Sequence, residues 1–255
     1  MQKLETEDIL GYQITHNTVS DCIATIADWI HNADSLKTFV CANPHSLFEA
    51  SKDNDFRRAL MNSDLITPDG SGIILASKIL GGDIRDRVTG SDVFWGLTDL
   101  LNKETGIKYY FLGSTEETLK KIRNKMSVEY PNVEVVGTYS PPFKPEFDDN
   151  DNRAMLEAIN SVKPDVLWVG MTAPKQEKWI NNNKDKLDVK FAGAIGAVFD
   201  FYVGNVKRSP PLFQKMGLEW LPRLIQEPRR LWRRNFVSSP MFLLRVFQQK
   251  FRGHQ

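Results

Sequence analysis

The sequence contains few of the residues that bind metal ions or form disulfide bonds. Its 255 residues include four histidines and only two cysteines, Cys22 and Cys41. Two cysteines do not build a disulfide framework, which favours a reducing compartment. The histidines lack a metal-binding spacing. The D-x-D patterns at 53–55 and 149–151 fall in a predicted polar helix and in a proline-rich loop, where we expect solvated surface.

Long apolar runs are also absent. Every apolar run is far shorter than the ~20 residues that cross a bilayer. The first residues, MQKLETEDIL, have neither the basic nor the apolar region of a signal peptide. We therefore expect a protein that is soluble or lies on a membrane surface.

Two common nucleotide-binding fingerprints are missing. The sequence contains neither G-x-G-x-x-G nor G-x-x-x-x-G-K-[ST], so these patterns give little support to a dinucleotide or P-loop site. A soluble nucleotide-binding enzyme of another class, such as a dehydrogenase, stays open as an alternative.

Positive charge is concentrated at the C-terminus. The net charge is +1, yet residues 207–255 hold eleven basic and two acidic residues, and the other 206 hold 22 and 30. The segment RLIQEPRRLWRRNF at 223–236 alone has five arginines. Such asymmetry indicates an anionic partner. Interleaved arginine and tryptophan also suit a nucleic acid, the other alternative, although the acidic remainder would repel it.

Short apolar segments alternate with amphipathic ones. The predicted strands are 38–43, 64–68, 108–113, 133–139, 165–170 and 190–195, and the predicted helices are 18–32, 45–60, 71–81, 90–104, 115–129, 150–162 and 174–185. A capping pattern, Ser114 followed by Glu117, opens one of these helices. The alternation predicts an α/β fold with a mainly parallel sheet and helices on both faces. Ligands of such sheets bind at the carboxyl ends of the strands.

The alternation stops after Asp200, and Ser-Pro-Pro at 209–211 breaks the chain. We therefore divide the sequence into an α/β domain, 1–206, and a basic C-terminal appendage, 207–255. The last predicted helix is amphipathic, and its apolar face is expected to carry Leu243, Leu244, Phe247 and Phe251.

Several polar residues follow predicted strands. Asp69 stands between Pro68 and Gly70, and Asn43 precedes a proline. Spacing alone favours a turn or helix-cap role for both. Gln176 lies in the first turn of a helix that opens after Gly170, and a helix N-terminus suits a phosphate. As a single motif this is a weak indication.

Six segments, in this order, resemble the WecG/TagA/CpsF glycosyltransferase family. They are TPDGSGIILASKILGG, RVTGSD, YYFLGS, GTYSPPF, VGMTAPKQEKWI and GAIGAVFDFYVGNVKRSP, and the resemblance runs from about residue 9 to 235. It implies a Rossmann-like fold whose C-terminal appendage associates with the membrane and completes the active site. It also implies an inverting glycosyltransferase that needs no metal.

The resemblance further implies the substrates. The donor would be a UDP-sugar carrying a hexose, N-acetylhexosamine or hexuronic acid, for example of the N-acetylmannosamine type. The acceptor would be an undecaprenyl-diphosphate-linked sugar in bacterial surface polysaccharide synthesis. The protein would be cytoplasmic and peripheral on the inner face of the cell membrane, bound to anionic lipid and not to nucleic acid. A homo-oligomer is a further expectation, because an apolar appendage can self-associate.

The family motifs assign roles to individual residues. Asp69 matches the proposed catalytic base, and Gln176 matches a pocket glutamine. Cys41 and Asn43 match a Thr-x-Asn pocket motif, from which Cys41 departs, and a thiol is a weaker hydrogen-bond partner than a hydroxyl. The arginines that grip the acceptor's diphosphate match Arg223, Arg230 and Arg233. We expect the nucleotide to contact Gly113, Tyr139, Gly170 and Gly196.

Overall fold

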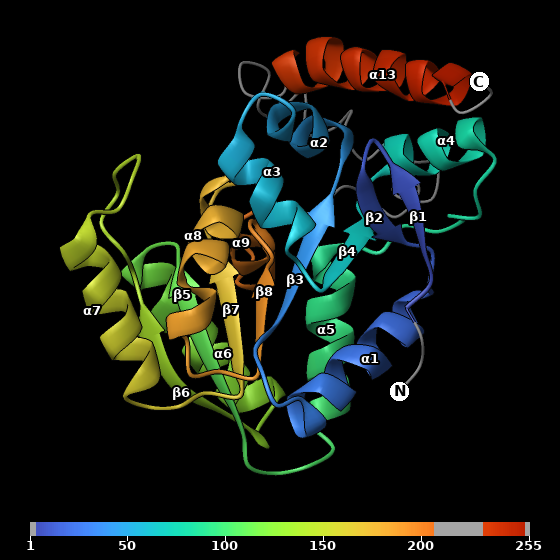
Figure 1. The fold of residues 1–255 in the computed structure, drawn as a ribbon. Helices are drawn as coiled ribbons and strands as arrows, with labels where there is room; N and C mark the ends of the chain where they lie inside the picture. Colours follow the sequence, from blue (N-terminus) through green and yellow to red (C-terminus); the bar gives the residue numbers. More distant parts are fainter. Residues whose placement is uncertain (1–3, 207–231, 253–255) are drawn as a thin grey trace.

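The computed structural model describes residues 4–206 and 232–252. Its centre is a parallel sheet in the strand order β4-β3-β8-β7-β5-β6 (Figure 1). The strands are β3 (Lys37–Ala42), β4 (Leu65–Pro68), β5 (Ile107–Gly113), β6 (Val133–Tyr139), β7 (Val166–Gly170) and β8 (Phe191–Ala194). The predicted α/β fold with a parallel, Rossmann-like sheet is confirmed.

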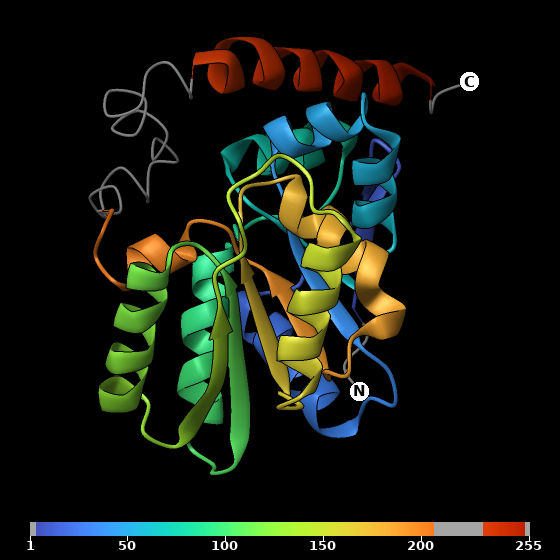
Figure 2. The same ribbon diagram turned by 90° about the vertical axis from the view of Figure 1, so that its left-hand side faces the viewer.

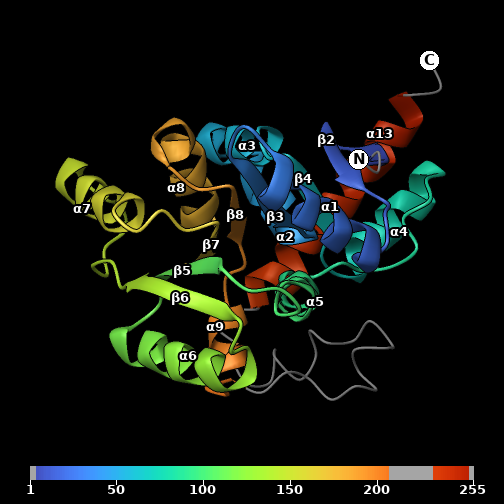
Figure 3. The same cartoon turned by 90° about the horizontal axis from the view of Figure 1, so that it is seen from below.

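Helices cover both faces of this sheet (Figure 3). One face carries α2 (Pro44–Ala50), α3 (Asn54–Met61), α7 (Asp149–Asn160) and α8 (Lys175–Asn183), which ends in a 3-10 turn (Lys184–Lys186). The other carries α1 (Val19–Asn32), α5 (Gly90–Leu101), α6 (Glu116–Glu129) and α9 (Val198–Tyr202). Alternate strand residues face the two layers: Tyr110 and Leu112 pack on the first, Tyr109 and Phe111 on the second.

One predicted helix and one predicted capping residue are wrong. The single helix expected at 45–60 is two: α2 ends at Ala50 with Ser51 as its C-cap, and Asp53 caps the start of α3. Its Oδ1 accepts hydrogen bonds from the amides of Asp55 and Phe56. The helix α6 is capped by Thr115, whose Oγ1 accepts from the Thr118 amide, and not by Ser114, which has a φ of 56°.

The two D-x-D patterns also lie elsewhere than expected. Asp53 precedes α3 and pairs with Lys178 instead of lying within a helix. The pattern at 149–151 forms the first turn of α7, which Asp148 caps. In residues 4–206 and 232–252, no group of three or more His, Cys, Asp or Glu side chains is arranged to hold a metal ion.

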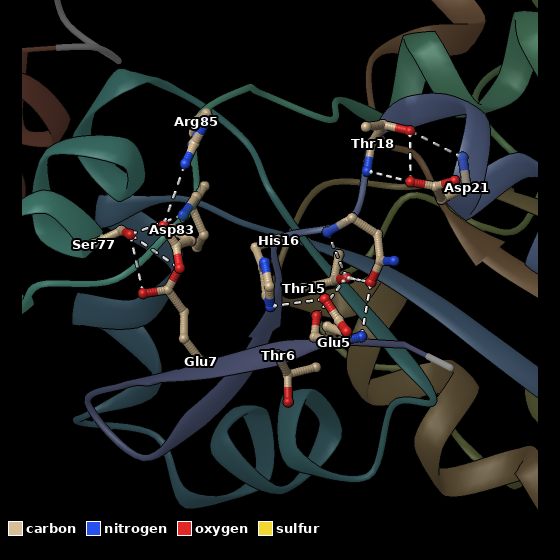
Figure 4. Close-up of polar contacts among 12 residues, drawn as sticks. Glu5, Thr6, Glu7, Thr15, His16, Thr18, Asp21, Ser77, Asp83 and Arg85 are labelled. Atoms are coloured by element: carbon tan, nitrogen blue, oxygen red, sulfur yellow. Dashed lines mark hydrogen bonds and ion pairs between the residues drawn. The ribbon is translucent and has the colours of Figure 1, made fainter. Parts of the chain in front are cut away.

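A small antiparallel hairpin, β1 (Thr6–Ile9) and β2 (Tyr12–Thr15), precedes the sheet and was not predicted. Its Glu7 carboxylate accepts from the Ser77 hydroxyl at 2.9 and 3.0 Å and from the Ile84 amide at 2.9 Å (Figure 4). A Cβ at Gly82 would meet this carboxylate at 1.5 Å. Glu7 thus holds the loop that connects α4 (Ser71–Leu80) to α5.

The C-terminal helix α13 (Ser239–Arg252) follows a π-helical turn (Arg234–Ser238) and packs on α2 and α4 (Figure 2). Its Phe242 and Val246 are fully buried. Gln249 Oε1 accepts from the Leu10 amide at 2.8 Å, which ties α13 to the hairpin. The predicted apolar face is therefore not the docking face: Leu243 is partly buried, while Leu244, Phe247 and Phe251 are exposed.

None of the described helices is long and apolar enough to cross a bilayer. The predicted chain break at 209–211 and the boundary at 207 lie outside the described residues, so the division into two domains stays a prediction. The described part of the appendage, 232–252, lies against the N-terminal half of the chain.

Candidate active site

The carboxyl ends of the parallel strands form one edge of the molecule. β3 and β8 are neighbours there, yet the helices that follow them, α2 and α9, lie on opposite faces of the sheet. Such a divergence opens a crevice in which α/β proteins bind ligands. The candidate site is built around this crevice and the adjoining end of β4.

Asp69 follows the last residue of β4 and is half-buried. Its amide donates to the Ala42 carbonyl at 2.7 Å, which fixes the backbone beside β3. Asp69 is not the N-cap residue of α4 (Ser71–Leu80), because that residue is Gly70, and a turn role for the Asp69 side chain stays a prediction. Its carboxylate acts electrostatically on the Cys41 thiol, and Thr67, two residues before Asp69, bonds to the Cys41 sulfur.

Cys41 lies on β3, is partly exposed and packs on the sheet face that α1 and α5 cover. Burial, followed by the Asp69 carboxylate, raises the pKa of the Cys41 thiol well above its usual range. The Thr67 hydroxyl donates to its sulfur at 3.6 Å, and the Gly90 amide at the start of α5 also bonds to it. This position therefore presents a neutral thiol.

Asn43 is the N-cap of α2, as its position before a proline predicted. Its Oδ1 accepts from the Ser46 amide at 3.0 Å, and Ser46 Oγ in turn accepts from the Asn43 amide at 2.8 Å. The cap uses the oxygen of the side-chain amide. Nδ2 forms no hydrogen bond within the described part of the chain, and it remains able to donate to a ligand.

Gln176 is buried and joins two loops of the crevice. Its Oε1 accepts from the Met171 amide at 3.2 Å and from the Gly196 amide at 3.0 Å. Its Nε2 donates to Glu177 Oε1 at 2.9 Å. These bonds leave one Nε2 hydrogen for a substrate, so most of the side chain holds the loops after β7 and β8 together.

Glu177 is a residue that sequence reasoning missed. Its side chain is buried, and burial raises its pKa to about 7. It also acts electrostatically on Cys41, across β8. Acidic residues in a first helical turn are ordinarily solvated, so nothing in the sequence indicated that Glu177 is buried. Its position directly after Gln176 was the one feature that could have drawn attention to it.

The glycines differ in what they provide. A Cβ at Gly113, which has a φ of 121°, would lie 2.4 Å from the Gly170 carbonyl oxygen, and one at Gly170 would strike the Phe199 ring at 2.4 Å. Both glycines are therefore required by packing. Gly196, with a φ of 55°, has no atom closer than 3.7 Å to such a Cβ. Its surroundings leave room for a ligand.

Tyr139 lies far from the reacting end of the site. It ends β6, five strand spacings from β4, which places it ~24 Å along the sheet from Asp69. Any contact with a bound nucleotide would be made at the end remote from Asp69.

Arg233 belongs to the appendage, and Arg223 and Arg230 lie outside the described residues. Burial lowers the pKa of His45, in the first turn of α2, and the Arg234 and Arg233 guanidinium groups lower it further. Arg233 therefore lies near the helix that Asn43 caps. The structure thus brings Asp69, Cys41, Asn43 and an appendage arginine to the same end of β3 and β4.

The arrangement combines a half-buried carboxylate, neutral hydrogen-bonding groups and, near the first turn of α2, guanidinium groups of the appendage. A carboxylate of this kind can accept a proton from a hydroxyl nucleophile. Arginine forks can bind the oxygens of a diphosphate. Both functions suit transfer of a group from a phosphate ester to an alcohol.

Comparison with known proteins identifies the family. The family described as "Glycosyl transferase WecG/TagA/CpsF family" matches residues 7–255. A relative from Bacillus subtilis (strain 168) is 33% identical over 208 residues, 82% of this chain and 78% of the relative. One from Staphylococcus aureus (strain MW2) is 25% identical over 244 residues, 95% and 92% of the two chains. Both relatives are named N-acetylglucosaminyldiphosphoundecaprenol N-acetyl-beta-D-mannosaminyltransferase. The chain belongs to the WecG/TagA/CpsF family and is a glycosyltransferase.

Proposed function

We propose that the protein transfers an N-acetylmannosamine-type sugar from a UDP-sugar to undecaprenyl-diphosphate-linked N-acetylglucosamine, in bacterial surface polysaccharide synthesis. The names of the two relatives support the acceptor and the transferred sugar. The observation that carries the proposal is the position of Asp69. It lies beside Cys41 at the strand ends, on the side of the sheet where the appendage docks.

In this proposal Asp69 is the general base. The acceptor hydroxyl attacks the anomeric carbon of the donor, and its proton passes to the Asp69 carboxylate. The new bond forms as the bond from the anomeric carbon to the phosphate oxygen breaks, and UDP leaves with the electron pair. A single displacement inverts the anomeric centre and needs no covalent nucleophile.

The pocket residues then divide the substrates between them. Asn43 Nδ2 and the Cys41 thiol face the sugar-transfer end near Asp69. Gly196 and the loops held by Gln176 receive the nucleotide in the crevice. Arg233, together with Arg223 and Arg230, binds the acceptor's diphosphate and compensates its charge without a metal ion.

The exposed face of α13 supports a peripheral position on an anionic membrane. Met241, Leu244, Phe247 and Phe251 recur every three or four residues and are all exposed, while the opposite face docks on the protein. A helix with an outward apolar stripe can lie in a lipid interface. We place this face on the cytoplasmic leaflet, where the lipid-linked acceptor would be reached.

A donor screen tests the function. Purified full-length protein is incubated with a short-chain polyprenyl-diphosphate N-acetylglucosamine and, separately, with UDP-linked N-acetylmannosamine, N-acetylglucosamine, glucose and glucuronic acid. Mass spectrometry should detect a product one N-acetylhexosamine heavier with unchanged yield in EDTA, and the NMR coupling constant of its anomeric proton should show inverted configuration. Transfer of none of these sugars would refute the proposal. NAD binding without UDP binding would favour a dehydrogenase-like enzyme.

A further inference from the structure

The first turn of α8 contains a carboxyl group that is almost completely removed from solvent. Glu177 is 5% exposed. One oxygen, Oε1, accepts the bond from Gln176 Nε2 at 2.9 Å. The other oxygen, Oε2, is fully buried and has no hydrogen-bond partner among the described residues. A buried ionised carboxylate is ordinarily paired with a cation or with several donors.

The nearby cations point away from Glu177. Lys175 Nζ bonds to the Lys144 carbonyl oxygen and lies over the Phe147 ring, towards the loop before α7. Lys178 pairs with Asp53, which caps α3. From β3 and β4, the groups near Glu177 are the neutral Cys41 thiol and, beyond it, the Asp69 carboxylate. No neighbour in the described chain supplies positive charge.

Glu177 is also linked mechanically to the crevice. Its Oε1 fixes the orientation of the Gln176 amide, and Gln176 Oε1 holds the amides of Met171 and Gly196. The carboxyl group thus lies one side chain away from the loops that would receive the donor's diphosphate. Negative charge on that diphosphate would act on Glu177 through a buried, weakly screened path.

We propose that Glu177 is a positioning residue that holds a proton when the donor is bound, so that donor binding takes up a proton at this carboxyl group. The inference rests on the proposed function, because it requires a nucleoside diphosphate in the crevice. In the free protein the carboxyl group exchanges its proton near neutral pH. Bringing a diphosphate to the Gly196 loop favours the neutral form, because two negative groups would otherwise share a site without a cation.

The pKa of Glu177, raised to about 7 by burial, agrees with this role. If the nucleotide binds only the protonated form, its apparent dissociation constant rises as the protonated fraction falls. Between pH 7.0 and 8.5 the expected weakening is about tenfold. Glu177→Gln keeps the shape and the bond from Gln176 and removes the titration.

Isothermal titration of full-length protein with UDP tests the inference. We expect the native protein at pH 7.5 to take up roughly half a proton or more per UDP, measured in two buffers of different ionisation enthalpy. Its affinity should weaken about tenfold from pH 7.0 to 8.5. Glu177→Gln should lose both effects, and the matched control Glu157→Gln, on the exposed side of α7, should keep both.

Two results would overturn the inference. Native protein that binds UDP above pH 7 without proton uptake would exclude it, whether or not the variant folds. Equal proton uptake by native protein and folded Glu177→Gln would assign the proton to another group. In either case the glycosyltransferase proposal stands. Failure of native protein to bind UDP at any pH would instead refute the proposed donor, and this inference with it.

Discussion

The imidazole Nδ1 of His45 lies 2.9 Å from the hydroxyl oxygen of Ser238, across 193 positions of the chain. This contact joins the first turn of α2, next to the Asn43 cap, to the segment that leads into α13. It keeps the appendage at the start of α2, which follows the end of β3. The position of Arg233 near the site depends on this docking.

Acid should loosen the docked appendage. Because burial and then Arg234 and Arg233 lower the pKa of His45, the unfolded chain binds a proton there before the folded chain does. Stability therefore falls as the pH drops below about 6.5, the ordinary value for histidine. The protection factors of the amides in 239–252, which are corrected for the intrinsic pH dependence of exchange, should fall from pH 7.5 to 5.5 in native protein, and His45→Gln should remove part of that fall. The control variant His31→Gln, on α1, should show the same pH dependence as native protein. If His45→Gln also showed the native pH dependence, protonation of His45 would not control the docking of the appendage.

The outward face of α13 should bind lipid. Phe247 is 45% exposed, and burying such a side chain is worth about 1.5–3 kcal/mol. Phe247→Glu should therefore weaken sedimentation with phosphatidylglycerol vesicles by tenfold or more, on the order of that free energy, without lowering the unfolding temperature. Val128, which is 79% exposed on α6, offers the control Val128→Glu. Equal vesicle binding by both variants would show that α13 does not contact the membrane.

Replacing Glu177 should change the pH dependence of stability. Its pKa is raised by burial from 4.5 to about 7, so the folded chain holds a proton that the unfolded chain loses between these values. Stability from this group is present below pH 4.5 and lost as the pH rises to 7. Relative to native protein, Glu177→Gln should gain up to about 3 kcal/mol between pH 5 and 8 in urea unfolding. If the difference in unfolding free energy between Glu177→Gln and native protein were the same at pH 5 and at pH 8, the carboxyl group would be solvated.

Both thiols should resist alkylation while the chain is folded. Burial, then Asp21, raises the pKa of Cys22 to about 12, and the pKa of Cys41 is also raised. At pH 8 the reaction of Cys22 with an aromatic disulfide should be on the order of a thousandfold slower than that of free cysteine, and both thiols should react once guanidinium unfolds the chain. Single Cys→Ser variants assign each rate. A folded-state reaction at the free rate would contradict the protonated Cys41.

The positions of the strands could be predicted from the sequence, but the order of the strands in the sheet could not. Buried β-branched and aromatic runs placed all six strands within one or two residues. The four-residue strands of the hairpin were missed, because β1, TEDI, carries two acidic residues and little apolar pattern. The position of β8 between β3 and β7 follows from long-range packing. That order is what brings the Gln176 loop to Gly196 and sets Glu177 across from Cys41.

The candidate site was predictable where strand ends alone decide position. Asp69, Cys41, Asn43 and Gly196 all lie at the expected edge. The burial of Glu177 was not predictable, because it depends on how α8 is rotated against its neighbours. The docking face of α13 was not predictable, because two faces of this helix are apolar, and periodicity cannot choose between them. Phe242 and Val246 bury one face, and Leu244 and Phe247 leave the other exposed.

The most direct test of the account is the Asp69→Asn variant, assayed for both sugar transfer and UDP binding. Removing the base should lower transfer to the lipid-linked acceptor by about 10²–10⁴-fold, with the UDP dissociation constant unchanged. Asp188→Asn, exposed beyond the opposite edge of the sheet, should leave both quantities at the native level. Transfer by Asp69→Asn at the native rate would contradict the assignment of this carboxylate as the base.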